Sequence, residues 1–98
     1  MATVNIKWFS PSVLSGATAV YGKDIYPPET FTSSASSQAT TNAAPDGVVL
    51  VRVVSYGGNV WLTIGKNPTA VTNTGTLILD GLPEVFKLEK GDKLAIIN

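Results

Sequence analysis

The chain has 98 residues, of which 44% are hydrophobic and 14% are charged, with seven basic residues balanced by seven acidic ones and no cysteine or histidine. This length predicts a single domain with a thin core over residues 1–98, and the scattered charges provide neither the basic stripe that nucleic acid requires nor the basic patch that a membrane surface requires. Because the chain lacks a thiolate nucleophile, the commonest general base and the commonest metal ligand, we expect no enzymatic activity, no cofactor and no bound metal.

Residues 4–9 are predicted to form the first strand, because apolar and polar residues alternate along them. The apolar residues of one face are Val4, Ile6 and Trp8. Pro11 and the serines on either side of it are predicted to end this strand. Residues 1–12 are therefore predicted to be an edge strand or a partner-binding arm, which would add a strand to the sheet of another protein.

The segment that follows is less regular, with a short extended piece at Ile25-Tyr26 and then Pro27-Pro28. Because proline cannot donate to a sheet ladder, this proline pair excludes a central strand at that point. Residues 29–41 are rich in Ser, Thr and Ala, so they are either a flexible linker or an edge strand. The β-branched threonines and Phe31 favour the strand.

The second half shows clearer strand patterns. Residues 48–55 form a nearly continuous apolar run, which is typical of a strand that is covered on both faces. Residues 60–64 alternate with period two, and further strands are predicted at residues 76–79, 85–88 and 94–97. Turn residues separate these segments at intervals of eight to twelve residues. Seven or eight short antiparallel strands are thus predicted, which indicates an all-β sandwich or barrel.

Few residues are suited to chemistry. Two acidic pairs, Asp80 with Glu84 and Glu89 with Asp92, each flank a turn, and nothing around them indicates burial. We interpret them as solvated turn residues rather than as the carboxylates of a glycosidase or a calcium site. The stretch Tyr56-Gly57-Gly58-Asn59 lacks the Gly-Lys-Ser/Thr ending of a phosphate loop and is interpreted as a tight turn.

The aromatic residues are the candidates for binding. Core packing is expected for Trp8 and Phe86, whereas Trp61 alternates out of phase with its apolar neighbours and faces either a second buried layer or a partner. Other aromatics lie in the irregular first third, as interface anchors often do, although core packing is an equal alternative. The candidate partner-binding residues are Trp8, Phe9, Tyr21, Tyr26, Phe31 and Trp61.

A resemblance covers roughly the last half of the chain, residues 50–97. The segments that carry it are Val51-Arg52-Val53-Val54, Val60-Trp61-Leu62-Thr63-Ile64-Gly65, Asn67-Pro68-Thr69-Ala70, Leu82-Pro83-Glu84-Val85-Phe86-Lys87-Leu88 and Gly91-Asp92-Lys93-Leu94-Ala95-Ile96-Ile97. This arrangement resembles small virion proteins of tailed bacteriophages. It implies a jelly-roll-like β-sandwich, and it implies a capsid decoration (cement) protein that stabilises the shell across capsomer contacts.

Further expectations follow from this resemblance. The partner would be the major capsid protein or another virion protein, the chain would form a dimer or trimer, and its location would be the virion after synthesis in the bacterial cytoplasm. The alternative is a host-surface or carbohydrate-binding module of a tail fibre or adhesin. In that case Tyr26, Tyr56 and Trp61 would stack on sugars.

Overall fold

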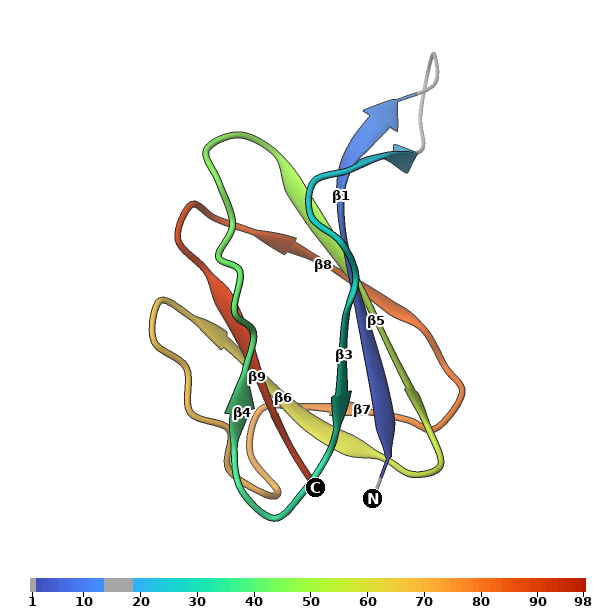
Figure 1. The fold of residues 1–98 in the computed structure, drawn as a ribbon, viewed down its shortest axis with the longest axis vertical. Helices are drawn as coiled ribbons and strands as arrows, with labels where there is room; N and C mark the ends of the chain where they lie inside the picture. The colour runs from blue at the N-terminus through green and yellow to red at the C-terminus, as the bar shows by residue number, and fades with distance from the viewer. Residues whose placement is uncertain (1, 14–18) are drawn as a thin grey trace.

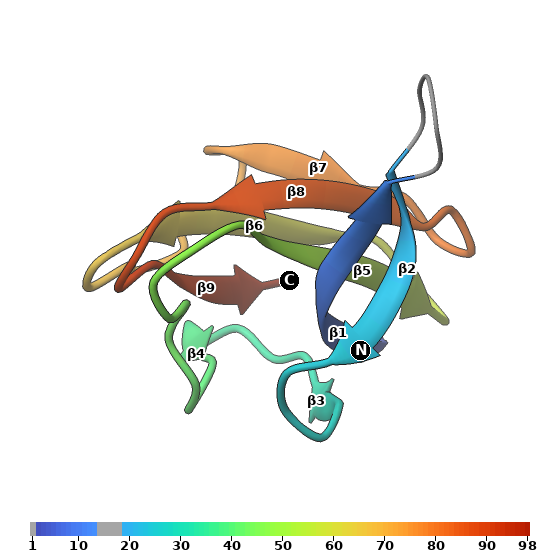
Figure 2. The same ribbon diagram turned by 90° about the horizontal axis from the view of Figure 1, so that it is seen from above.

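The computed structural model describes the backbone of residues 2–13 and 19–98 and the side chains of residues 2–10 and 24–98. These residues form nine strands and no helix: β1 (Thr3–Val13), β2 (Ala19–Asp24), β3 (Glu29–Thr32), β4 (Gln38–Ala39), β5 (Val49–Tyr56), β6 (Val60–Gly65), β7 (Thr76–Ile78), β8 (Glu84–Leu88) and β9 (Lys93–Ile97). The strands form two antiparallel sheets in two layers (Figures 1 and 2), which confirms the predicted all-β sandwich.

The first sheet has the strand order β2-β1-β5-β8, with β3 also paired to β1, and the second has the order β4-β9-β6-β7. The chain crosses between the sheets after β3, β4, β5, β7 and β8. Such repeated crossing is typical of a jelly-roll-like sandwich. The segment 29–41, for which a linker was the alternative, contributes the two short strands β3 and β4 at the margins of opposite sheets.

Strand β1 lies inside the first sheet, between β5 on one side and β2 and β3 on the other. The prediction of an edge strand is therefore wrong over Thr3–Phe9, whereas Pro11–Val13 pair with β2 alone and a partner-binding role for residues 1–12 stays a prediction. Pro11 does not end the strand either, because the pairing of β1 with β2 shifts register between Phe9 and Pro11. A shift of this kind accommodates a residue that has no N–H to donate.

The main core lies between the two sheets. It is built from alternate residues of the long strands, and its largest fully buried side chains include Trp8, Ile6, Leu62, Ile78, Leu88, Leu94 and Ile96. Phe86 packs against this cluster as a partly buried residue, so the core positions predicted for Trp8 and Phe86 are confirmed. Along β5 the predicted cover on both faces is incomplete, since Leu50 and Arg52 are only partly buried.

The two ends of the described chain are joined by one buried hydroxyl. Ser33, which follows β3, accepts a hydrogen bond from the Ala2 amide at 2.8 Å and donates one to the Asn98 side chain. The N and C labels accordingly lie side by side in Figure 1. Because Ala2 leads into the first sheet and Asn98 follows β9 of the second, Ser33 also links the two layers.

Candidate functional site

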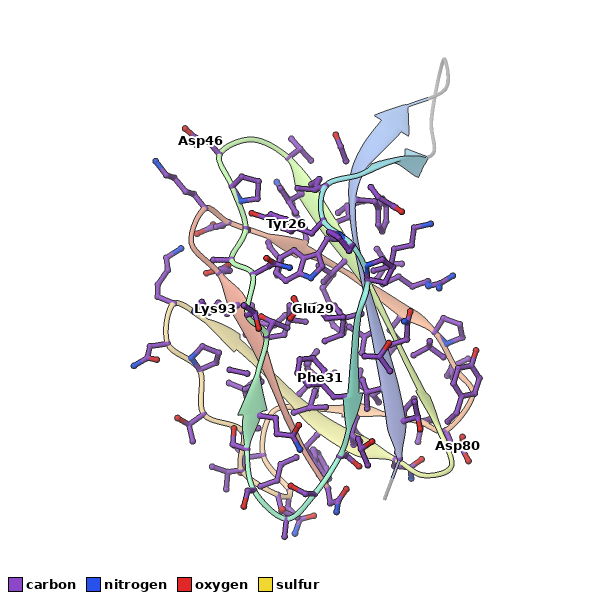
Figure 3. All side chains as sticks on the ribbon, viewed as in Figure 1. Tyr26, Glu29, Phe31, Asp46, Asp80 and Lys93 are labelled. Atoms are coloured by element: carbon purple, nitrogen blue, oxygen red, sulfur yellow. The ribbon has the colours of Figure 1, made fainter. Side chains whose placement is uncertain are left out.

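Glu29 connects three distant parts of the chain through its carboxylate. It accepts hydrogen bonds from the Trp8 indole N–H at 3.1 Å, the Thr41 amide at 2.8 Å and the Asn42 side-chain amide at 3.2 Å. Tyr26 packs edge-on against the Trp8 ring, with 5.6 Å between the ring centroids, and its hydroxyl donates to the Ala43 carbonyl. In Figure 3 the labels of Tyr26, Glu29 and Phe31 lie one below another near the middle of the view.

The burial of the side chains around Glu29 shows which of the predicted partner-binding residues are accessible to a partner. Trp8 and Phe9 are at most 2% exposed, so their side chains cannot contact a partner in the folded protomer, and that prediction is wrong for both. Tyr26 and Phe31 are partly buried against the core, where their rings shield the Trp8 side of the sandwich. Tyr21 belongs to β2, and its side chain lies outside the described residues.

Trp61 lies on the outer face of the second sheet. There it packs against a small separate cluster formed by Ala70, Ala95 and Ile97. Ala70 belongs to the connection between β6 and β7, which crosses this face and is held by a hydrogen bond from the Ala70 amide to the Ser37 hydroxyl at 2.8 Å. Trp61 is thus partly covered by this cluster, and contact of its exposed part with a partner stays a prediction.

The acidic residues near the turns hold backbone amides. Asp80 accepts from the Gly57 amide at 3.0 Å, and Asp92 accepts from the Glu89 amide at 2.9 Å. The Glu89 amide and then the Lys66 ammonium lower the pKa of the Asp92 carboxyl below its ordinary value. Within the described ranges no three acidic, histidine or cysteine residues are grouped to hold a metal. These positions give the acids a structural role in turns.

A surface that the sequence patterns did not indicate lies where the β5–β6 turn meets the β7–β8 connection. We call it the corner patch, and it comprises four large apolar side chains that are 43–57% exposed, Tyr56, Leu79, Leu82 and Val85, with Arg52 beside Val85 in the strand register. The Asp80 label in Figure 3 marks this corner of the molecule. Clusters of exposed apolar side chains on a soluble domain mark sites of interaction.

The backbone beneath the corner patch is held by four hydrogen bonds. The Gly81 amide donates to the Ser55 carbonyl at 2.7 Å, and the Leu82 amide donates to the Leu79 carbonyl at 3.2 Å. Asp80 makes the other two hydrogen bonds. Its amide donates to the side-chain oxygen of Asn59, and its carboxylate accepts from the Gly57 amide. Leu79 and Leu82 are thus held on a hydrogen-bonded connection, and Tyr56 and Val85 on strands, which lowers the entropy lost when a partner binds.

One sequence signal did exist for this surface. Val85 alternates out of phase with Phe86 and Leu88, which face the core, so it had to point outward. The proximity of Tyr56 to Leu79 and Leu82 had no such signal, because it depends on a parallel bridge between Ser55 and Asp80 that joins the ends of two strands.

No family model, curated protein or solved structure matches this chain. Among the described residues, no helix has the length and apolar character that spanning a membrane would require.

Proposed function

We propose that the chain is a structural protein of a bacteriophage virion, specifically a capsid decoration protein that binds across capsomer contacts. The observation that carries the proposal is the corner patch, an exposed apolar surface that includes a tyrosine and is presented on strands and a hydrogen-bonded connection. Large aromatic and aliphatic anchors on a fixed backbone are typical of protein–protein contact sites.

The resemblance to tailed-phage virion proteins adds a second line of support. Four of its five segments fall in or around the strands β5, β6, β8 and β9, which supply most of the core that both sheets share, and the fifth, residues 67–70, lies in the connection between β6 and β7. A decoration protein stabilises a shell because it binds the assembled shell and not its separate subunits. Such binding requires an exposed contact surface and no catalytic site.

The glycan-binding alternative has less support. It requires Tyr26, Tyr56 and Trp61 as exposed stacking faces, yet Tyr26 packs against Trp8 and Trp61 packs against the outer cluster of the second sheet. Tyr56 is the one member of this set that is more than half exposed. We therefore propose the decoration role alone.

The test uses particles of the phage whose genome encodes this chain. Its first part measures the content of the particles, and its second part measures the stability of their shells. Mass spectrometry of purified particles is expected to find the chain in stoichiometric amounts, and particles that lack it are expected to lose shell integrity at a lower temperature. Purified chain added back to such particles should restore the loss. A chain that is absent from particles, or that fails to bind shells which lack it, would refute the proposal.

A further inference from the structure

Two aspartates of the chain are followed directly by glycine, Asp46-Gly47 and Asp80-Gly81. An aspartate in this position can react with its own backbone, because a glycine has no side chain to hinder approach to its amide nitrogen. The nitrogen bonds to the side-chain carbonyl carbon of the aspartate, and one carboxyl oxygen leaves as water with the amide proton and the carboxyl proton. The product is a succinimide ring.

Water then opens this ring at either of its two carbonyl carbons. Opening at one carbon restores aspartate, and opening at the other gives isoaspartate, in which the main chain runs through the former side-chain carbon. The net reaction is an isomerisation, and it requires nothing but water. Its rate in a folded protein depends on whether the amide nitrogen and the carboxyl group are free to approach each other.

Hydrogen bonds hold both reacting groups of Asp80-Gly81 in place. The Gly81 amide donates to the Ser55 carbonyl at 2.7 Å, and the Asp80 carboxylate accepts from the Gly57 amide at 3.0 Å. In addition, the Asp80 amide donates to the Asn59 side chain at 2.8 Å. Ring closure at this position therefore requires the connection to open locally first.

Asp46-Gly47 lies between β4 and β5 and lacks comparable restraints. The Asp46 side chain is 88% exposed, and its ion pair with Lys90, at 3.9 Å between two exposed groups, is weak. Within the part of the chain that the structure describes, the Gly47 amide donates no hydrogen bond, and the space around the Gly47 Cα is open. Neither reacting group has to leave a firm partner before the ring closes.

The segment around Asp46 also has room for the product. Ala44 is buried, its amide donates to the Asp92 carbonyl, and its carbonyl accepts from the Gly91 amide, so this residue is fixed on the turn between β8 and β9. Val49 is buried at the start of β5. None of the residues 45–48 between these two is buried. They can therefore accommodate the additional main-chain carbon of isoaspartate while the sandwich stays folded.

We propose that Asp46 is a site of spontaneous isomerisation to isoaspartate in the folded chain, and that the fold protects Asp80 from the same reaction. The labels of the two residues lie at opposite ends of the molecule in Figure 3. Modification at Asp46 is thus remote from the corner patch, and the proposal stands or falls independently of the virion role.

Peptide mapping by mass spectrometry tests the proposal on the purified full chain, incubated for several weeks in water enriched in heavy oxygen. Each passage through the ring adds one oxygen atom from water, so the label measures the reaction at Asp46 and at Asp80 in the same sample. Asp46 is expected to react about ten times faster than Asp80 or more, because Asp80 reacts only after local opening. A folded chain that takes up no label at Asp46, or takes it up equally at both positions, would overturn the proposal.

The same measurement in concentrated urea separates the fold from the local sequence. In the unfolded chain both aspartates are followed by an unrestrained glycine, and they are expected to react at similar rates. If Asp46 kept its tenfold advantage in urea, the neighbouring residues rather than the fold would explain the difference, and the protection assigned to Asp80 would be refuted.

Two variants test the surroundings of each site. Asp46→Glu keeps the charge beside Lys90 and is expected to abolish the reaction there, because a glutamate would have to close a larger ring. Asn59→Ala removes the acceptor of the Asp80 amide and is expected to raise the rate at Asp80 several-fold, with Asp46 of the same sample as the reference. An unchanged rate at Asp80 in this variant would contradict protection by its hydrogen bonds.

The accommodation of the product has a separate test. The isoaspartate form, isolated by chromatography from the aged chain, is expected to melt within about 4 °C of the fresh chain. A larger fall in the melting temperature would contradict the assignment of Asp46 as a modification site that the folded chain tolerates.

Discussion

At the scale of single residues, Glu29 joins segments that lie far apart in the sequence of the first half of the chain. Its carboxylate accepts the Trp8 indole N–H and the Thr41 amide, so it joins β1 and β3 to the segment after β4. The Trp8 ring is fully buried, and its N–H has no other acceptor described. Removing the carboxylate would therefore leave a donor in the core without a partner.

We expect Glu29→Ala to lower the free energy of unfolding by about 2–3 kcal/mol, the usual cost of leaving buried donors unsatisfied together with the loss of a hydrogen bond to a charged group. Urea unfolding followed by tryptophan fluorescence measures it. Glu89→Ala is the control, since that side chain is exposed, and it should change stability by less than about 0.5 kcal/mol. Equal effects of the two variants would contradict the role given to Glu29.

The burial of Trp8 was predictable from the sequence, whereas its partner was not. Alternation with Val4 and Ile6 places Trp8 on the core face of a strand wherever that strand lies in the sheet. Its hydrogen bond to Glu29 spans 21 positions of sequence and depends on which strand pairs with β1. No local pattern determines that pairing, so the sequence does not identify Glu29 as the acceptor of the indole N–H.

At the scale of elements, β1 is a central strand whose two faces have different environments. Ile6 is fully buried in the core, whereas its neighbour Lys7 is partly exposed and forms an ion pair with Asp24 at 3.5 Å. Over Thr3–Phe9 the strand has β5 along one edge and β3 and β2 along the other, so the core cannot close without it.

We expect Ile6→Ala to lower the free energy of unfolding by about 2–5 kcal/mol, because it creates a cavity in the core. Lys7→Ala should cost at most about 1 kcal/mol, because it removes a partly exposed ion pair. Chemical denaturation of both variants measures their free energies of unfolding, so that the core face and the outer face of one strand are compared at adjacent residues. If Ile6→Ala were no more costly than Lys7→Ala, β1 would not be the central strand of the folded chain.

The connection between β6 and β7 depends on a glycine that lies close to the second sheet. Gly75 has a φ of +92°, and a Cβ there would approach the Leu62 carbonyl oxygen more closely than real Cβ atoms do. Gly47 has a similar φ of +106°, yet it has open space around it. The two glycines therefore share a positive φ, which would strain any residue with a Cβ, and they differ in the space around that Cβ.

We expect Gly75→Ala to be more destabilising than Gly47→Ala. Both variants place alanine at a positive φ, which costs about 1–2 kcal/mol. Only Gly75→Ala also brings a Cβ against β6 and displaces the connection from it. Thermal unfolding gives the comparison. In addition, Gly75→Ala should change the fluorescence of Trp61, since the displaced connection covers that side chain through Ala70. Identical melting temperatures would show that this connection does not lie against β6.

The strands of the second half were predicted within one or two residues, because their apolar residues either alternate or, over 48–55, form a continuous run between turn signals. Extension of β1 through Pro11 was not predictable in the same way, since a register shift accommodates the proline and a shift leaves no mark on hydrophobic periodicity. The corner patch was also missed, because it is assembled from strand ends that meet only in the folded sandwich.

At the scale of the whole molecule, the turn between β8 and β9 ties the layers together through Asp92. Its carboxylate accepts from the Glu89 amide and contacts the Lys66 ammonium at 3.0 Å, and its backbone carbonyl accepts from the Ala44 amide. The amide and then the ammonium favour the ionised carboxylate, so the pKa of Asp92 in the folded chain lies below its ordinary value of 3.8.

A pKa that is lower in the folded chain than in the unfolded one makes stability depend on pH in a defined direction. The contribution of Asp92 is fully present above the unfolded value of 3.8 and is lost as the pH falls through the folded value. We therefore expect the free energy of unfolding to decrease below about pH 4. Asp92→Asn should be less stable than the parent at pH 7 and should show a smaller loss between pH 5 and pH 2, measured by urea unfolding at each pH.

Asp46→Asn, which removes a carboxylate on an exposed side chain, is the control and should follow the parent curve. If Asp92→Asn lost stability in acid as steeply as the parent, the turn between β8 and β9 would not contribute to the acid sensitivity of the fold.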